Sequence, residues 1–225
     1  MIEKEVKEFA EKNWSHYIKS ISECSKPSKD KAPLVESEIE VYCFDDICKK
    51  YFDENRLPAS VDCVDFTEKE IYLVEFKSGF REKITKENYK KSEQAICEHM
   101  KGICEYYWSN FFKLRDIEKE ELISNLKLKA IDTYMVFGKK VFPLCDKCES
   151  KRLHLIVVID ADYIDNMEDT LGELAGCSVT SNNWVTKIKN SLSRFKVEKD
   201  ALGNDYLYDE IDVYTVQEYK HFMGI

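Results

Sequence analysis

Two short apolar runs, separated by a few polar residues, form the clearest pattern in the chain. Residues 61–66 (Val-Asp-Cys-Val-Asp-Phe) and 71–77 (Ile-Tyr-Leu-Val-Glu-Phe-Lys) are rich in β-branched and aromatic residues, which is typical of strands. The residues between them, 67–70, are polar and few enough for a hairpin loop. The pattern therefore predicts two neighbouring antiparallel strands.

The length of that loop also predicts the register of the hairpin. It sets Phe66 opposite Ile71, and counting on along both strands then sets Asp62 opposite Glu75. Residues directly opposite each other share a face of the sheet. Without a bulge, the two carboxylates therefore lie side by side.

Two more charged residues are placed by the same register. Lys77 lies two residues beyond Glu75, so its side chain points to the same face. Asp65 would instead face Tyr72 on the other side of the sheet. The register thus favours Asp62 over Asp65 as the partner of Glu75.

A pair of facing carboxylates in such strands needs a cause. Both strands are otherwise apolar on both faces, so the sheet should be covered on both sides. There, Asp62 and Glu75 would repel each other and lose hydration. Lys77 could neutralise one of them, and a divalent cation would relieve the rest; carboxylate oxygens suit magnesium or manganese. The alternative is a solvated salt-bridge cluster at a strand end.

The rest of the chain alternates helical and strand patterns. Helices are predicted over residues 3–22, 35–54, 84–113, 163–175 and 183–197, with a further turn or two in 116–125. Strands are predicted over 128–137, 153–159 and 207–217, and a polar loop over 23–33. The order helix, hairpin, long helix, strand, strand predicts an α/β fold.

Composition bounds the class of protein. The 225 residues, 44% of them hydrophobic, are enough for one domain with a sizeable core. With 7 Gly and 4 Pro, no long flexible linker is expected. No apolar run is long enough for a transmembrane helix, and the N-terminus is charged without the apolar region of a signal peptide. We therefore expect a cytoplasmic protein with no membrane partner.

The net charge of −9 argues against a protein that coats nucleic acid without specificity. It is compatible with an acidic active site beside a local basic face. Two basic clusters are visible: Arg81, Lys83, Lys86, Lys90 and Lys91, and then Lys187, Lys189, Arg194, Lys196 and Lys199. Each could contact nucleic acid, or could be an ordinary solvated helix face.

Other candidate chemistry is sparse. The nine cysteines read as small buried hydrophobes in a cytosolic chain. Cys145 and Cys148 have a zinc-like spacing, but a structural zinc site needs a second ligand pair, so we interpret them as a reduced loop pair. Asp160 and Asp162 end an apolar run and are interpreted as caps of the following helix. No phosphate-binding glycine loop or nucleophile elbow occurs.

The chain carries Asp62, then a gap of twelve residues, then Glu75-Phe76-Lys77. This arrangement resembles the signature of the PD-(D/E)xK nuclease superfamily. Val-Glu-Phe-Lys-Ser-Gly at 74–79 is similar to the segment found in its resolvase-like and RecB-like members, although Val61 stands where the leading proline is usual. The resemblance covers about residues 34–160. It implies a restriction-endonuclease-like core, a mixed central β-sheet flanked by helices. An N-terminal helix (1–30) and a C-terminal helical extension (161–225) would pack on this core within a single domain, 1–225.

The resemblance also implies a function, a Mg²⁺-dependent nuclease. Asp62 and Glu75 would hold Mg²⁺ or Mn²⁺, and Lys77 would orient the attacking water or stabilise the transition state of phosphodiester hydrolysis, with DNA as the expected substrate. Many members add a glutamate from the helix before the hairpin. Among Glu36, Glu38 and Glu40 we prefer Glu36 or Glu40.

Further contacts are implied on the helix after the hairpin. Tyr89 and Gln94 resemble a Tyr and a Gln that some members carry there. We expect nucleic-acid contacts from these two and from the basic positions Lys86, Lys90, Lys91, Lys187 and Lys189. The competing interpretation is a nuclease-fold module without activity that serves in binding or assembly. Whether the chain acts alone, as a homodimer or in a larger complex is left open.

Overall fold

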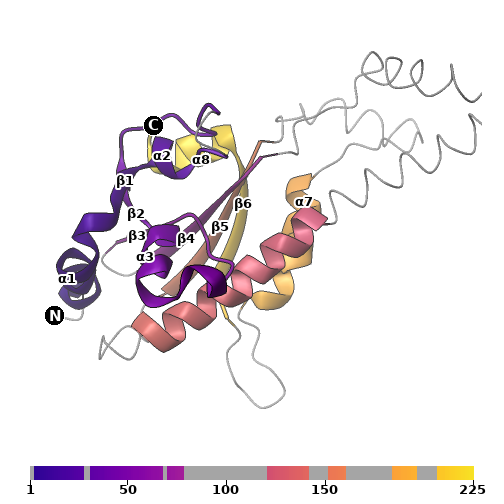
Figure 1. Ribbon diagram of the computed structural model, residues 1–225. Helices are drawn as coiled ribbons and strands as arrows, with labels where there is room; N and C mark the ends of the chain where they lie inside the picture. The colour runs from indigo at the N-terminus through magenta and orange to yellow at the C-terminus, as the bar shows by residue number, and fades with distance from the viewer. Residues whose placement is uncertain are drawn as a thin grey trace, which may run out of the picture.

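A six-stranded mixed sheet forms the centre of the molecule (Figure 1). The computed structural model describes residues 3–27, 31–67, 70–78, 121–141, 152–160, 184–196 and 207–225. The strands are β1 (Ile18–Ser20), β2 (Glu40–Cys43), β3 (Cys63–Phe66), β4 (Glu70–Lys77), β5 (Arg152–Ile159) and β6 (Glu210–Thr215). They lie in sequence order; β1 to β4 are antiparallel neighbours, and β5 and β6 continue the sheet in parallel with β4. The predicted α/β class with a mixed sheet is confirmed.

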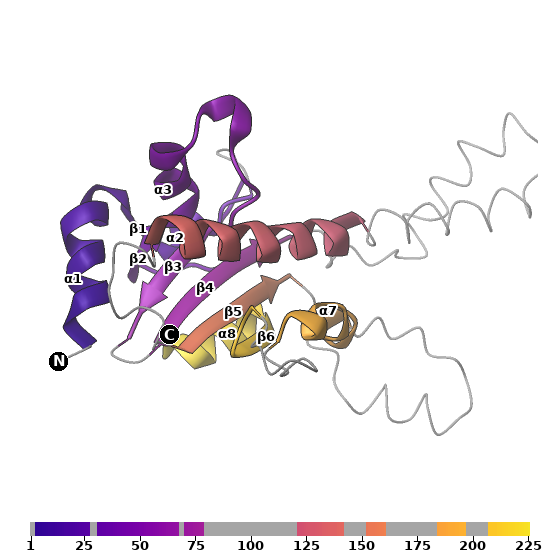
Figure 2. The ribbon, with the colours of Figure 1, turned by 90° about the horizontal axis from the view of Figure 1, so that it is seen from below.

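Helices lie on both sides of this sheet. They are α1 (Glu3–Trp14), α2 (Ile21–Cys24), α3 (Phe44–Tyr51), an unlabelled helix at 121–136, α7 (Trp184–Leu192) and α8 (Val216–Met223). Short 3-10 turns occupy Ser15–Tyr17, Glu54–Arg56 and Ser193–Phe195, and a π turn, Phe137–Val141, follows the 121–136 helix. Figure 2 shows the 121–136 helix on one side of the sheet and α8 on the other.

The two faces of the sheet carry separate apolar cores. Alternate residues of β4 divide between them, so we call them the Leu73 face and the Val74 face. On the Leu73 face, the sheet packs against residues of α1, α3, the 121–136 helix and α7, among them Trp14, Phe44, Ile47, Ile123, Leu126, Ala130, Ile188 and Leu192. On the Val74 face, Ile21, Val35 and Tyr219 cover it. Both faces are thus buried, as the apolar strands predict.

The predicted hairpin is confirmed in position and register. Phe66 pairs with Ile71, and Asp65 pairs with Tyr72. Strand β3 begins at Cys63, so Asp62 lies one residue before it and still donates its backbone N–H to the Val74 carbonyl at 3.1 Å. The local signals of loop length and alternation were therefore sufficient to align the two strands.

Two predicted elements are wrong. Residues 35–54 were expected to be one helix, but 40–43 form β2, which pairs with β1 and β3, and only 44–51 are helical. Residues 128–137 were expected to be a strand, but they belong to the 121–136 helix. The helix buries Ile123, Leu126 and Ala130 at three- and four-residue spacing, whereas Leu128, Ile131 and Met135 remain exposed.

The other predicted elements divide into three groups. The strands at 153–159 and 207–217 and the helix at 183–197 correspond to β5, β6 and α7. The helix predicted over 3–22 ends at Trp14, and β1 follows at 18–20. The helices predicted over 84–113 and 163–175 lie outside the described residues. The sheet extends beyond residues 34–160 at both edges, through β1 and β6.

Candidate functional site

Asp62 and Glu75 come together on the Leu73 face. The Glu75 side chain is 2% exposed and that of Asp62 is 17% exposed. The second carboxylate oxygen of Asp62, Oδ2, accepts a hydrogen bond from the Phe76 backbone N–H at 2.6 Å. This bond ties the Asp62 side chain to the strand that carries Glu75, so the two carboxylates are held as a pair.

A lysine that sequence analysis missed contacts both carboxylates. Nζ of Lys129 lies 2.7 Å from Oε2 of Glu75 and 3.5 Å from Oδ1 of Asp62. It therefore takes the neutralising position that was predicted for Lys77. Lys129 follows Leu126 by three residues on the buried side of the 121–136 helix, so correct assignment of this segment as a helix would have revealed a lysine beside the core stripe.

The 121–136 helix is fastened to the chain just before Asp62. The Thr133 hydroxyl accepts a hydrogen bond from the Val61 N–H at 3.0 Å, and the Asp132 carboxylate accepts one from the Ala59 N–H at 2.9 Å. From the other side, the buried Tyr208 hydroxyl donates to the Ala130 carbonyl at 2.6 Å. These bonds fix the helix backbone at Lys129 relative to the carboxylate pair.

Burial and mutual repulsion govern the charge of the pair. Burial raises the pKa of Asp62, and Lys129 and the Phe76 N–H oppose that rise. Burial and then the charge of Asp62 raise the pKa of Glu75, again against the attraction of Lys129. One ammonium group thus does not fully compensate two buried carboxylates, and the pair retains a preference for a proton or a further cation.

Lys77 lies at the end of β4, on the Leu73 face and partly buried. Its charge helps to lower the pKa of Glu75, but it is the smallest of the five influences on that carboxyl, after burial, Asp62 and the two effects of Lys129. Its backbone carbonyl accepts a hydrogen bond from the Asp160 N–H at 3.3 Å. Lys77 therefore lies near the pair without holding it.

The helix that was expected to carry a third acidic residue, Glu36 or Glu40, is not found at these positions. Glu36 and Glu38 lie outside any helix, Glu40 opens β2 opposite Ser20, and all three side chains are exposed. The residue that follows β2 is Phe44, the first residue of α3. Its N–H donates a hydrogen bond to the Asp62 carbonyl at 2.9 Å. Glu36 and Glu40 were chosen because they were assigned to a helix that is not there.

Asp45, in the first turn of α3, is an acidic residue close enough to act on the charge of Asp62. Its carboxylate accepts a hydrogen bond from the Ser60 hydroxyl at 2.5 Å. Its charge also contributes to the raised pKa of Asp62. Sequence analysis had no signal for it, since its place depends on the turn from β2 into α3.

A divalent cation at this site would need oxygen ligands from the surrounding side chains. Within the described ranges, no three or more His, Cys, Asp or Glu side chains gather in a way that could hold a metal ion. The pair therefore offers two carboxylates. Magnesium is commonly bound through one or two carboxylates, with water and substrate phosphate completing six oxygens. Asp62 and Glu75 fit that partial role, provided Lys129 yields the oxygen it contacts.

The second basic cluster is partly neutralised. Lys189 lies 3.3 Å from a carboxylate oxygen of Asp212, and Lys196 lies 2.5 Å from one of Glu210. Both acids belong to β6. The predicted contacts Lys86, Lys90, Lys91, Tyr89 and Gln94 lie outside the described residues, as do Cys145 and Cys148. Of the nine cysteines, Cys43, Cys48 and Cys63 are free and buried, as predicted for small apolar residues.

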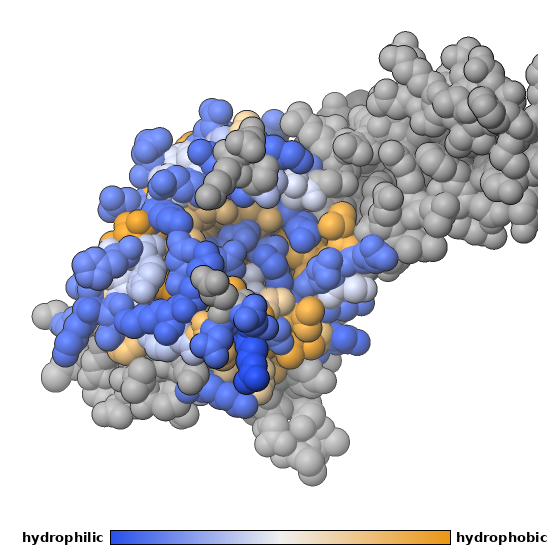
Figure 3. All heavy atoms as spheres, in the orientation of Figure 1, coloured by the Kyte–Doolittle hydropathy of each residue, from blue (hydrophilic) through white to orange (hydrophobic). Residues whose placement is uncertain are grey.

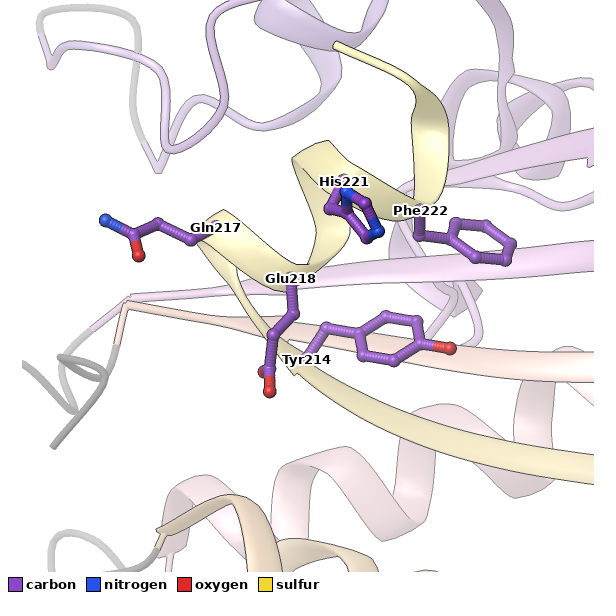
Figure 4. A pocket seen from close by; sticks show the side chains of 5 residues that line it. All are labelled: Tyr214, Gln217, Glu218, His221 and Phe222. Carbon is purple, nitrogen blue, oxygen red and sulfur yellow. The ribbon is translucent and has the colours of Figure 1, made fainter. Parts of the chain in front are cut away.

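A surface hollow of about 510 Å³ lies elsewhere, between β6 and α8 (Figure 4). Its lining consists of Tyr214, Gln217, Glu218, His221 and Phe222. Glu218 already caps α8, because its carboxylate accepts the Thr215 N–H at 2.8 Å. Tyr214 packs with the Val74 face, on the side of the sheet away from the carboxylate pair. The hollow is thus separate from the candidate site.

The described face visible in Figure 3 is largely polar. In Figure 3, hydrophilic residues cover most of the visible described face and apolar residues form smaller patches. Among the described helices, none has the length and apolar character to cross a membrane. No protein-family model matches the chain, and neither a curated protein nor a solved structure matches it. The case for a function therefore depends on the residues and their geometry.

Proposed function

We propose that this chain is a metal-dependent nuclease that hydrolyses phosphodiester bonds, with DNA as the expected substrate. The observation that carries the proposal is the buried pair of Asp62 and Glu75 on adjacent strands. Two carboxylates and one ammonium leave the group one positive charge short of neutrality. Such an arrangement is unfavourable unless a proton or a further cation binds, because buried charges are costly without partners.

The residues divide the chemistry between them. Asp62 and Glu75 would hold Mg²⁺ or Mn²⁺; the bound ion would supply an activated water and offset charge on the scissile phosphate. Lys77, on the same face, would orient that water or stabilise charge on the pentacoordinate transition state. Asp45 could receive a hydrogen bond from a water at the border of the site, taking the place first assigned to Glu36 or Glu40.

Two further features support the proposal. A helix, α3, precedes the antiparallel pair β3 and β4, and β5 runs parallel to β4 within a mixed sheet, as a PD-(D/E)xK nuclease core would require. The spacing from Asp62 to Glu75-Phe76-Lys77 is the one that suggested this superfamily. Both are consistent with a nuclease core.

One observation favours a second candidate. Lys129 already contacts both carboxylates, so the site has a counterion of its own. A nuclease-fold module that has lost activity, and serves in nucleic-acid binding or assembly, would tolerate such a permanent salt bridge. The two candidates differ in whether Mg²⁺ supports turnover.

The test is a cleavage screen in Mg²⁺ with duplex, single-stranded and branched DNA and with RNA. We expect cleavage of at least one substrate by the native protein and its loss in Asp62→Asn and Glu75→Gln. Asp65→Asn is the matched control, since Asp65 lies on the opposite face and accepts the Phe66 N–H at 2.8 Å. It should retain most activity.

The possible results separate the candidates. If no substrate is cleaved but nucleic acid binds, the inactive module is the better account. If Asp65→Asn abolishes cleavage while Asp62→Asn does not, the wrong carboxylate has been assigned. Circular dichroism of each variant must match that of the native protein, so that lost activity is not lost folding.

A further inference from the structure

Lys129 lies where a divalent cation would bind. Its ammonium is 2.7 Å from Glu75 and 3.5 Å from Asp62, and its side chain is 22% exposed whereas that of Glu75 is almost completely buried. The lysine is thus the more exposed partner of Glu75. A cation that binds Oε2 of Glu75 would have to compete with this ammonium for the same oxygen.

The backbone around Lys129 is held by hydrogen bonds on both sides of the helix. Thr133 and Asp132 bind the backbone N–H groups of Val61 and Ala59, and Tyr208 binds the carbonyl of Ala130, next to Lys129. The lysine side chain, in contrast, is a flexible four-carbon stem with a strongly hydrated end group. We therefore expect the side chain, which is partly exposed, to withdraw more readily than the backbone.

The net charge of the site changes if a divalent cation binds and the Lys129 side chain leaves Glu75. With Lys129 alone, two carboxylates and one ammonium sum to −1. With a divalent cation as well, these groups sum to +1, and Lys77 on the same face adds a further positive charge. An ammonium and a divalent cation compete for Oε2 of Glu75, since like charges in a site of low dielectric constant repel strongly.

We propose that Lys129 is an exchangeable counter-cation, which holds the Asp62–Glu75 pair together without metal and leaves Glu75 when a divalent cation binds. This inference rests on the proposed function, because it requires a cation at this pair. It adds a regulatory step: the affinity for the metal is set by competition with a lysine built into the helix. It also accounts for a complete salt bridge at a site proposed to bind metal.

The test measures the accessibility of the Lys129 amine. The native protein is treated briefly with an amine-acetylating reagent in EDTA, and then in Mg²⁺ or in Mn²⁺, and acetylation of each lysine is followed by peptide mass spectrometry. We expect Lys129 to be protected in EDTA and to react roughly tenfold faster with the ion, the change for loss of a contact worth about 1.4 kcal/mol. Lys127 on the same helix is the matched control and should not change.

A second protein keeps the result interpretable. In the Asp62→Asn/Glu75→Gln variant, Lys129 has lost both partners and should react fast with or without the ion. Calorimetric titration of Mn²⁺ into both proteins, in the absence of nucleic acid, reports independently whether the pair binds a cation.

Each outcome has one meaning. If Mn²⁺ binds the native protein but not the variant while Lys129 stays protected, the exchange is overturned and the proposed metal chemistry stands. If Lys129 is already reactive in EDTA, it is not the counter-cation. If native protein and variant bind Mn²⁺ equally or not at all, the ion does not use the pair, and both the exchange and the proposed function are overturned.

Discussion

The Thr133 hydroxyl accepts a hydrogen bond from the Val61 N–H at 3.0 Å, which joins the 121–136 helix to the residue before Asp62. Thr133 and Val61 are both buried. Because Lys129 lies one helical turn before Thr133, this bond determines how the ammonium meets the carboxylate pair. Stability and site geometry therefore depend on the same contact.

Replacing Thr133 with Val removes the acceptor while keeping the shape. The Val61 N–H would remain buried without a partner, which costs about 1–3 kcal/mol. For a protein of this size, that corresponds to a fall in Tm of roughly 2–4 °C per kcal/mol. Thr133→Ser keeps the hydroxyl and should lose less. Differential scanning calorimetry of both variants is the measurement; equal losses would show that the methyl group, not the hydrogen bond, matters at this position.

The pH dependence of stability should report on Glu75. Burial and the charge of Asp62 raise the pKa of Glu75 to about 8. Between its ordinary value and about 8 the folded protein binds more protons than the unfolded chain, so this contribution to stability is greatest at low pH and is lost as the pH rises. In EDTA, we expect the Tm to fall from pH 5 to pH 8.

Glu75→Gln provides the control for that measurement. It cannot titrate, so its Tm should fall less over the same range. One pKa unit corresponds to about 1.4 kcal/mol, so the difference between the proteins should be at least roughly 3 °C. Parallel curves for the native protein and Glu75→Gln would contradict the raised pKa.

Divalent cations should stabilise the native protein by mass action. A ligand that binds only the folded state at 100 times its Kd adds about 2.7 kcal/mol. We therefore expect Mg²⁺ or Mn²⁺ to raise the Tm by several degrees in a thermal-shift titration. The effect should vanish in Asp62→Asn/Glu75→Gln. The same response in both proteins would mean that the ions bind elsewhere.

Lys77 should act on turnover more than on binding. A single ammonium contributes little to an interface with many phosphates, but much to charge that develops in a partly buried site. Lys77→Ala should lower kcat strongly and leave affinity nearly unchanged, measured as cleavage in Mg²⁺ and binding in Ca²⁺. Equal losses of both would make Lys77 a phosphate anchor. No loss of either would favour the inactive module.

Local sequence was sufficient for the hairpin and for the shared face of its acids. A short polar loop and two alternating strands define the register of β3 and β4, because the side-chain period of a strand is two and loop length determines which residues pair. The same reasoning placed Lys77 on the face of Glu75. The pattern of elements also indicated the α/β class, with β5 and β6 correctly located.

The remaining partners of the site depended on tertiary structure. Lys129 is separated from Glu75 by 54 residues, and no local period relates a helix to the carboxylates it packs against. Glu36 and Glu40 do not lie on a helix beside the pair, because residues 40–43 pair with β1 and β3, which overrides their helical pattern. Periodicity determines which residues of one element share a face; only the packing of that face against another element determines which charges meet across it.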